Sequence, residues 1–362
     1  MKIIISVMVG LLFLLAAGAQ AAPDGKMIVT DLERRQVEVP RNPSRIICLG
    51  PGSLRLVCYL GKTDKVAGVE AFEKSPPVGR TYLWANPGLA RRPGIGQGGP
   101  AGINKEPDLE AVLKVNPEVI FVANMEAAKA EGLQKKMGIP VVILSYGGFA
   151  TFDEVVFESL RLTGKILQAD QRAEEVIAFI ENARRDLRKR TEAYNESQKP
   201  RVYVGGIGFR GTQGIESTDA GYFPLDWVRA KNLAKEAASK GHRFIDKEKL
   251  LSWNPDLIFL DGGGFDIIRQ DYQKKPEFYN NLKAFMSKRV YVFYPYNWYV
   301  TNIDTAVVDA YAAGKILYPQ SFADIDPRMK ADEIYSFLLG QSVCGQMEKD
   351  FGKLGRTVAF PP

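Results

Sequence analysis

Two stretches of the chain repeat one pattern, DLEAVLKVNPEVIFV at residues 108–122 and DKEKLLSWNPDLIFL at residues 246–260. They align without a gap, and each contains Asp-x-Glu, an Asn-Pro pair, an acidic residue and an apolar run. Because the residue before proline is disfavoured in the right-handed helical region, Asn-Pro predicts the end of a short helix. The apolar run that follows predicts a buried strand. The repeat therefore predicts two lobes that share one architecture.

Short apolar runs alternate with helix-forming segments throughout the chain, which is typical of parallel sheets built from βαβ units. The sequence predicts strands at residues 45–49, 65–69, 118–123, 140–144, 201–204, 257–260 and 290–293. It predicts helices at about 54–60, 225–230, 304–317 and 326–339, with Ser53 as the cap of the first. Residues 82–102 are predicted to be a loop. The predicted fold class is α/β, with two Rossmann-like lobes and mainly parallel central sheets.

Residues 152–194 contain few helix breakers and form a broken helical stripe that Gly164 and Asp170 are expected to interrupt. Its second part, about 169–193, would be roughly 37 Å long and could cross a domain boundary. We therefore predict an N-terminal lobe at residues 22–160, a rigid linker helix within 161–198 and a C-terminal lobe at 199–362. A long surface helix within one domain is the alternative.

The first 21 residues have the pattern of a secretory signal peptide. Lys2 precedes an apolar run at residues 3–17, which is short for a bilayer span, and Ala19-Gln20-Ala21 resembles a cleavage site. No cysteine follows the apolar run, so we expect export without a lipid anchor at that point. A membrane anchor or a buried N-terminal strand is the alternative.

The composition excludes several kinds of site. The chain has one histidine, His242, expected in a loop, so a zinc site built on several histidines is impossible. Its three cysteines, Cys48, Cys58 and Cys344, could form one disulfide or none. A net charge of +6 and a pI near 9.0 suit an anionic ligand or surface. The basic residues form no arginine-rich block, so we expect no nucleic-acid partner. No catalytic residue, metal ligand or cofactor is predicted.

Glycine-rich segments follow several predicted strands, at residues 50–55, 145–149, 205–211 and 261–265. Open α/β sheets bind ligands at the carboxyl ends of their strands. Gly94–Gly99 is also glycine-rich but follows no predicted strand, so it is not a dinucleotide fingerprint. Arginine and aromatic side chains suit a large, flat or acidic ligand, although core packing is the alternative for each aromatic. The candidate ligand-binding residues are Arg55, Arg80, Tyr82, Trp84, Tyr146, Phe209, Arg210, Tyr222, Phe265, Tyr296 and Trp298.

Five segments together resemble the substrate-binding proteins of ABC importers for iron complexes and cobalamin. They are SRIICLGPGSLRLVCYLG, DLEAVLKVNPEVIFV, TFDEVVFESLRLTGKILQADQRA, DKEKLLSWNPDLIFL and TNIDTAVVDAYAAGKILYP. The resemblance covers nearly the whole mature chain. It implies a periplasmic location, two α/β lobes joined by one long rigid helix, small closure, and no enzymatic activity. It also implies a monomer that delivers its ligand to a permease dimer in the inner membrane.

By position in the repeat, the resemblance assigns Glu110 and Glu248 as the contacts to arginines of that permease dimer. Helix capping is the competing role, although Asp108 or Asp246 could serve as the cap. The shortage of histidines argues for a chelated metal over a bare ion. The expected ligand is a ferric siderophore, with haem or a corrinoid as the alternative. A sensory ligand-binding module and a metal-cofactor enzyme are the less favoured classes.

Overall fold

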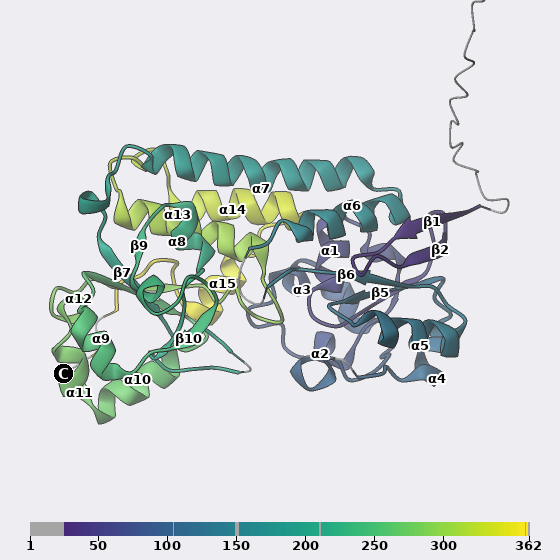
Figure 1. Cartoon of the computed structure of the whole chain (residues 1–362), viewed down its shortest axis with the longest axis horizontal. Helices are drawn as coiled ribbons and strands as arrows, with labels where there is room; N and C mark the ends of the chain where they lie inside the picture. The colour runs from purple at the N-terminus through teal and green to yellow at the C-terminus, as the bar shows by residue number, and fades with distance from the viewer. Residues whose placement is uncertain (1–24, 104, 149–151, 210, 359, 361–362) are drawn as a thin grey trace, which may run out of the picture.

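A four-stranded parallel sheet forms the frame of each half of the chain in this computed structural model (Figure 1). The structure describes residues 25–103, 105–148, 152–209, 211–358 and 360, so the predicted signal peptide lies outside the described residues. In lobe 1 the strand order is β4-β3-β5-β6. These strands are β3 (Ile46–Leu49), β4 (Val66–Gly68), β5 (Val119–Ala123) and β6 (Val141–Leu144).

Lobe 2 repeats this topology with the order β12-β11-β7-β9. Its strands are β7 (Arg201–Gly205), β9 (Lys231–Asn232), β11 (Leu257–Asp261) and β12 (Val290–Phe293), and all three pairings are parallel. In both lobes the first strand is central, the second lies on one side of it, and the third and fourth lie on the other. The predicted α/β class with two similar lobes is confirmed.

The repeated sequence occupies the same place in both lobes. Helices α4 (Leu109–Val115) and α9 (Lys247–Trp253) each lead into the third strand, β5 or β11. Each helix ends at the asparagine of its Asn-Pro pair, and Asn116 and Asn254 adopt left-handed conformations with φ of 44° and 43°. Asparagine tolerates this region better than most residues, which explains why asparagine precedes both prolines.

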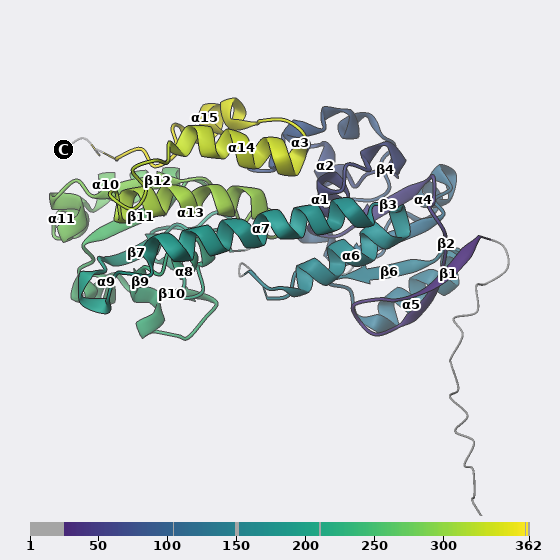
Figure 2. The ribbon, with the colours of Figure 1, turned by 90° about the horizontal axis from the view of Figure 1, so that it is seen from above.

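Several helices run between the lobes (Figure 2). Helix α7 (Asp170–Thr191) follows α6 (Val155–Leu167) and lies against α13 (Ile303–Leu317) and α8 (Phe223–Trp227). Helix α14 (Pro327–Leu339), from the C-terminal part of the chain, packs against α13 and also against α1 (Ser53–Tyr59) and α3 (Thr81–Ala85) of lobe 1. The connection between the lobes is therefore a layer of helices as well as the predicted long helix.

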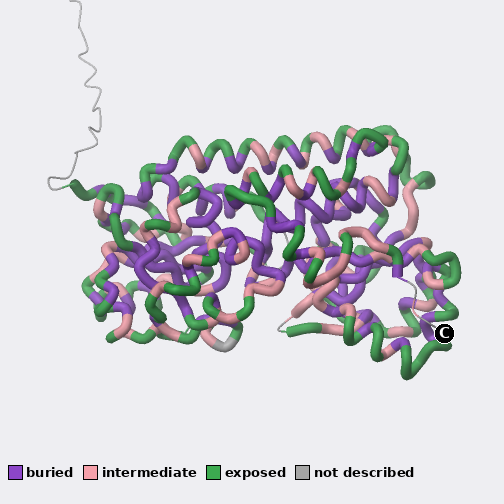
Figure 3. The backbone as a smooth tube through the Cα atoms, turned by 180° about the vertical axis from the view of Figure 1, so that it is seen from behind, coloured by how far each residue is buried: buried purple, intermediate pink, exposed green. Residues whose placement is uncertain are grey.

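One hydrophobic cluster extends through this layer. It joins the core of lobe 1, the inner face of α7 and the α13–α14 pair to part of the core of lobe 2. In Figure 3, α7 shows buried and exposed residues in alternation along its length, as expected for a helix with one face on this cluster. Smaller clusters fill the other face of each sheet.

The remaining elements surround these sheets. Two small antiparallel sheets pair β1 (Lys26–Thr30) with β2 (Gln36–Pro40), and β8 (Ser217–Asp219) with β10 (His242–Phe244). The other helices are α2 (Ala71–Lys74), α5 (Ala127–Met137), α10 (Phe265–Lys274), α11 (Pro276–Asn280), α12 (Lys283–Met286) and α15 (Cys344–Phe351). Short 3₁₀ turns occupy Thr63–Lys65, Pro87–Arg91, Pro100–Gly102, Glu196–Gln198 and Leu233–Glu236.

Four local predictions were wrong. Ser53 lies inside α1 and donates its hydroxyl to the carbonyl of Leu49, while Gly52 is the N-cap. Gly164 lies within α6, whose end is instead marked by Gln168 in the left-handed region. The predicted loop at 82–102 contains most of α3 and two 3₁₀ turns, because local backbone bonds shape it. His242 lies in β10, paired with Asp219.

The three cysteines are free and buried.

Candidate functional site

The carboxyl ends of both sheets meet around the segment 294–302, which connects β12 to α13. Tyr146, after β6, donates its hydroxyl to the carbonyl of Gly52, after β3. The Trp298 ring lies between two glycines, one from each lobe, because a Cβ added at Gly79 or Gly263 would stand 3.3 or 3.1 Å from it. Segments from both lobes thus converge on one small region.

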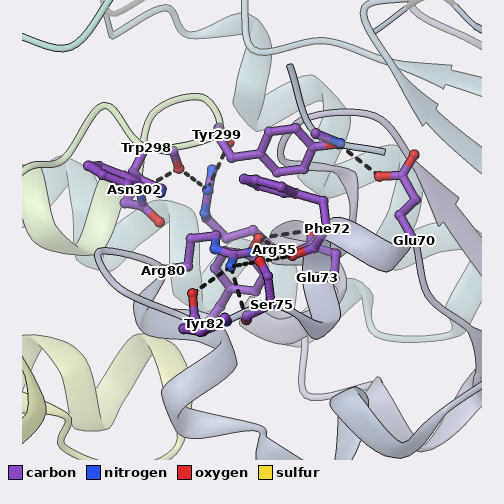
Figure 4. A network of polar contacts seen from close by, with 12 residues as sticks. Arg55, Glu70, Phe72, Glu73, Ser75, Arg80, Tyr82, Trp298, Tyr299 and Asn302 are labelled. Atoms are coloured by element: carbon purple, nitrogen blue, oxygen red, sulfur yellow. Dashed lines mark hydrogen bonds and ion pairs between the residues drawn. The ribbon is translucent and has the colours of Figure 1, made fainter. Parts of the chain in front are cut away.

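Arg55 of α1 is fully buried and binds the backbone of this segment (Figure 4). Its guanidinium donates to the carbonyl oxygens of Thr301 at 2.9 Å, Tyr299 at 3.0 Å and Trp298 at 3.2 Å. The guanidinium carbon also lies 4.8 Å from the centre of the Tyr82 ring. Arg55 therefore ties lobe 1 to a loop of lobe 2, and a ligand contact by Arg55 stays a prediction.

Arg80 and Tyr82 form a second buried group, with Glu73 of α2. The Arg80 guanidinium lies 3.1 Å from the Glu73 carboxylate and also donates to the carbonyl of Phe72 at 2.7 Å. Tyr82 donates its hydroxyl to Glu73 at 2.7 Å. Burial raises the pKa of Glu73, which Tyr82 and Arg80 oppose. This group fixes the α2–α3 segment beneath the interlobe contact.

Asp304, in the first turn of α13, is a third buried contact between the lobes. Its carboxylate accepts hydrogen bonds from the hydroxyls of Tyr59 and Thr81, both in lobe 1. Burial raises the pKa of Asp304, whereas the bond from Thr81 and the nearby Arg55 charge lower it. Asp304 and Arg55 are therefore complementary charges on opposite sides of the interface.

The other predicted ligand residues occupy different places. Tyr146, Tyr222 and Tyr296 are buried in the core, and Trp84 is partly buried against it. Phe265 lies on α10, where it stacks 5.8 Å from Phe360. Phe209 stacks on His242 at 4.2 Å beside the end of β7, and Arg210 lies outside the described residues. The structure therefore brings together Arg55, Tyr82, Tyr146 and Trp298, while Phe209 and Phe265 lie at separate places in lobe 2.

A small crevice of about 80 Å³ opens at the carboxyl ends of β3 and β5 in lobe 1. These neighbouring strands lie where the strand order reverses, which is where open α/β sheets usually bind ligands. In lobe 2 the corresponding strand ends pack closely together, because a Cβ added at Gly264 would be 2.5 Å from the carbonyl oxygen of Gly206. The crevice is lined by Leu49, Gly50, Pro51, Glu70, Gly96, Gln97, Gly98, Gly102, Ile103, Lys105, Glu106, Pro107, Val122, Ala123 and Met125.

Glu70 is the buried carboxyl group of this crevice, and the sequence analysis missed it. It is only 7% exposed, and burial raises its pKa to about 7. One of its oxygens accepts from the Gly50 amide at 3.1 Å, and the other accepts from the Tyr299 hydroxyl of lobe 2 at 2.8 Å. The sequence feature that could have indicated Glu70 is the glycine-rich segment Gly94–Gly99, whose backbone wraps around this residue. Nothing in the sequence shows that this segment and Glu70 are in contact.

Tyr299 and Val300 both have positive φ, of 56° and 66°. This region is unfavourable for most residues, and a β-branched valine there is an outlier. The surrounding bonds hold the strained turn, because Arg55 binds the Tyr299 carbonyl and Asn302 donates to the carbonyls of Tyr296 and Trp298. Tyr299 therefore projects from a strained turn of lobe 2 onto lobe 1.

Glu110 and Glu248 occupy equivalent exposed positions in the first turns of α4 and α9. These helices lie one in each lobe, on the side of the molecule opposite α7 (Figure 1). The Asp108 side chain caps α4 by accepting from the Ala111 amide, so Glu110 is not needed as a cap. Asp246 is the N-cap residue of α9 by position, but its side chain makes no capping hydrogen bond there. Neither glutamate has an ion pair or a side-chain hydrogen bond with a residue that the structure describes.

Within the described ranges, no group of three or more histidine, cysteine, aspartate or glutamate side chains is placed to hold a metal ion. Nor do those ranges contain a helix with the length and apolarity required to cross a bilayer.

Known proteins with this architecture include the molybdate-binding protein MolA of Haemophilus influenzae. It is 22% identical over 85% of this chain and 89% of MolA, and its molybdate-bound structure gives a TM-score of 0.69 over 87% of this chain and 98% of that one. The Helicobacter pylori CeuE structure, a Ni–His complex, gives 0.62 at 18% identity, covering 90% of this chain and 99% of CeuE. The petrobactin-binding protein YclQ of Bacillus subtilis is 21% identical over 75% of this chain and 81% of YclQ.

The family model for periplasmic binding proteins matches residues 46–296. This match covers more than half of the chain and includes both sheets, the crevice of lobe 1 and α7. The relatives are substrate-binding proteins, and the predicted resemblance is confirmed. The chain belongs to the periplasmic binding protein family, as a substrate-binding protein of the ABC-transporter type.

Proposed function

We propose that this protein captures a chelated metal complex, with a ferric siderophore as the first expectation, and delivers it to an ABC permease. The observation that carries the proposal is the meeting of the strand ends of both lobes around residues 294–302, next to the open crevice of lobe 1. The crevice is lined by residues of lobe 1, and the hydrogen bond from Tyr299 to Glu70 links it to a loop of lobe 2. A ligand that reaches Glu70 would therefore affect a contact between the lobes.

The name of one relative supports this ligand class, because YclQ is a petrobactin-binding protein. MolA is a molybdate-binding protein, and molybdate is an oxyanion, so its name supports only a small-molecule ligand. Haem or a corrinoid is the alternative within this class, and the glycine-lined strand ends would let any such complex approach the backbone closely.

The partner that we propose is a permease dimer in the inner membrane, contacted by Glu110 and Glu248 from a periplasmic monomer. The two exposed carboxylates at equivalent positions of two similar lobes support this role, because a two-fold partner would present matched basic sites. A ligand-binding module without a permease would need no such pair.

Fluorescence titration tests the ligand class. The purified protein is titrated with ferric trihydroxamate and tricatecholate complexes, haemin, cobalamin and molybdate. We expect saturable quenching by a ferric siderophore, because Trp298 lies at the meeting point of the lobes while Trp227 and Trp253 are buried in the core.

Trp298→Phe should remove most of the quenching while calorimetry still detects binding, and Trp253→Phe serves as the matched control. Binding of haemin or cobalamin alone would select the alternative ligand. Binding of molybdate alone, or of none of these compounds, would contradict the proposal.

A further inference from the structure

We propose that Glu70 is a specificity-determining residue, which selects ligands that present a hydrogen-bond donor such as a primary ammonium or a hydroxyl group to the crevice of lobe 1. In this structure the Tyr299 hydroxyl of lobe 2 takes the place of that donor. The inference deepens the proposed function and rests on it, because it assumes that the crevice belongs to the ligand site.

The contacts of Glu70 show that its carboxyl group acts as an acceptor. Both of its oxygens receive hydrogen bonds, one from the Gly50 amide at 3.1 Å and one from the Tyr299 hydroxyl at 2.8 Å. No basic side chain that the structure describes forms an ion pair with Glu70. A buried carboxyl group without a counter-charge is costly to ionise, so a donor or cation from the ligand would find a favourable partner there.

Glu70 is the main buried polar group of the crevice. Its other charged residues are Lys105 and Glu106, which are both exposed, and Glu106 is paired with Lys136. Much of the remaining wall is apolar or glycine, including Leu49, Val122 and Met125. A ligand group with an alkyl stem and a donor at its end would match such a wall, because the stem would bury apolar area and the donor would reach Glu70.

The glycine-rich segment 94–99 is built around Glu70. A Cβ at Gly98 would lie 2.5 Å from the Glu70 Cβ, and one at Gly99 would lie 2.8 Å from the Phe72 ring. Both glycines also have positive φ, of 61° and 69°. Close wrapping of this kind requires glycine on two grounds, space and backbone conformation. The segment thus encloses one carboxyl group, which gives the glycine-rich pattern a structural reason.

Tyr299 connects the crevice with lobe 2 (Figure 4). Its hydroxyl donates to Glu70 and accepts from the Gly99 amide at 3.0 Å, and its ring lies 4.7 Å from the Phe72 ring. A ligand donor that binds Glu70 would displace the Tyr299 hydroxyl. The turn itself would stay in place, because Arg55 and Asn302 bind its carbonyl groups.

Amide NMR with a small probe tests this selectivity without any siderophore. The ¹⁵N-labelled protein is titrated with n-butylammonium and, in parallel, with butyrate. We expect n-butylammonium to shift the Gly50 and Gly99 amides in a saturable way, and butyrate to leave them unchanged. Glu70→Gln should weaken the apparent affinity about tenfold, as expected for loss of a charged hydrogen-bond partner. Glu131→Gln, which removes an exposed carboxylate of α5, should have no effect.

Tyr299→Phe provides an independent readout if Glu70→Gln fails to fold. Removing the competing hydroxyl should strengthen n-butylammonium binding. Equal shifts with butyrate, or no response of the Gly50 and Gly99 amides, would overturn the inference. Unaltered affinity in both variants would also overturn it. None of these outcomes depends on whether a ferric complex binds, so failure here is distinct from failure of the proposed function.

Discussion

At the scale of single residues, Arg55 shows how a buried charge can organise an interface. Its guanidinium donates to three carbonyl groups of residues 298–301 and faces the Asp304 side of the interface. Hydrogen bonds to a charged group are stronger than neutral ones, and a rigid fork of donors suits several fixed acceptors. Arg55 therefore holds a turn whose backbone conformation would otherwise be unfavourable.

Asp261 leads to a prediction about pH. It is 2% exposed at the end of β11, and burial raises its pKa to about 7 from an ordinary value of 3.8. The folded protein therefore binds more protons than the unfolded chain between about pH 4 and pH 7, so stability should fall as pH rises through that range.

Asp261→Asn keeps an acceptor for the Gly263 amide but cannot ionise. Urea unfolding at several pH values should show that the variant loses less stability than the wild type between pH 4 and pH 7. The difference should be on the order of 4 kcal/mol at most. An identical pH slope in the two proteins would contradict this account of Asp261.

At the scale of elements, the two copies of the helix–strand unit differ in how their asparagines are used. The Asn254 side chain accepts from the Lys283 amide at 2.8 Å, which joins α9 to α12. Asn116 occupies the same backbone conformation, but its side chain has no such bond to the described residues. The conformation is therefore common to both units, and the added hydrogen bond belongs to lobe 2.

Glycine substitutions separate these two contributions. Asn116→Gly should change the free energy of unfolding by only a few tenths of a kcal/mol, because glycine also accepts positive φ. Asn254→Gly should cost about 1–2 kcal/mol, since it leaves the Lys283 amide without its acceptor. Chemical denaturation of both variants measures the difference. Equal costs at the two positions would show that the Lys283 bond adds nothing.

The elements were largely predictable from the sequence, whereas the site was not. Periodicity and the Asn-Pro pairs predicted the long helix and every strand of the two parallel sheets except β9, because these signals are local. Arg55 and Tyr146 lie in or next to glycine-rich segments at strand ends. This pattern fits a residue that contacts a ligand as well as a buried residue that holds two segments of the chain together. The carbonyl groups that Arg55 binds are about 245 residues away from it in the sequence. Glu70 is also held from lobe 2, so sequence spacing gave no sign of its role.

At the scale of the whole molecule, two similar lobes carry two equivalent carboxylates on one side. Glu110→Lys combined with Glu248→Lys should abolish transport in cells and leave ligand affinity of the purified protein unchanged. The reason is that both residues are exposed and lie outside the crevice of lobe 1. Uptake assays and calorimetry on the same double variant measure the two quantities. Equal loss of both would contradict the docking role, as would full transport by the double variant.

The packing of α14 on lobe 1 also has a consequence for the order of folding. Helix α14 covers α1 and α3, and Gln341 donates to the carbonyl of Ala85, so residues made near the end of synthesis complete a surface made near its beginning. Until residues 327–347 emerge from the ribosome, lobe 1 exposes apolar area that they later bury. A chain that lacks these residues should therefore be less stable and more prone to aggregate than the full chain.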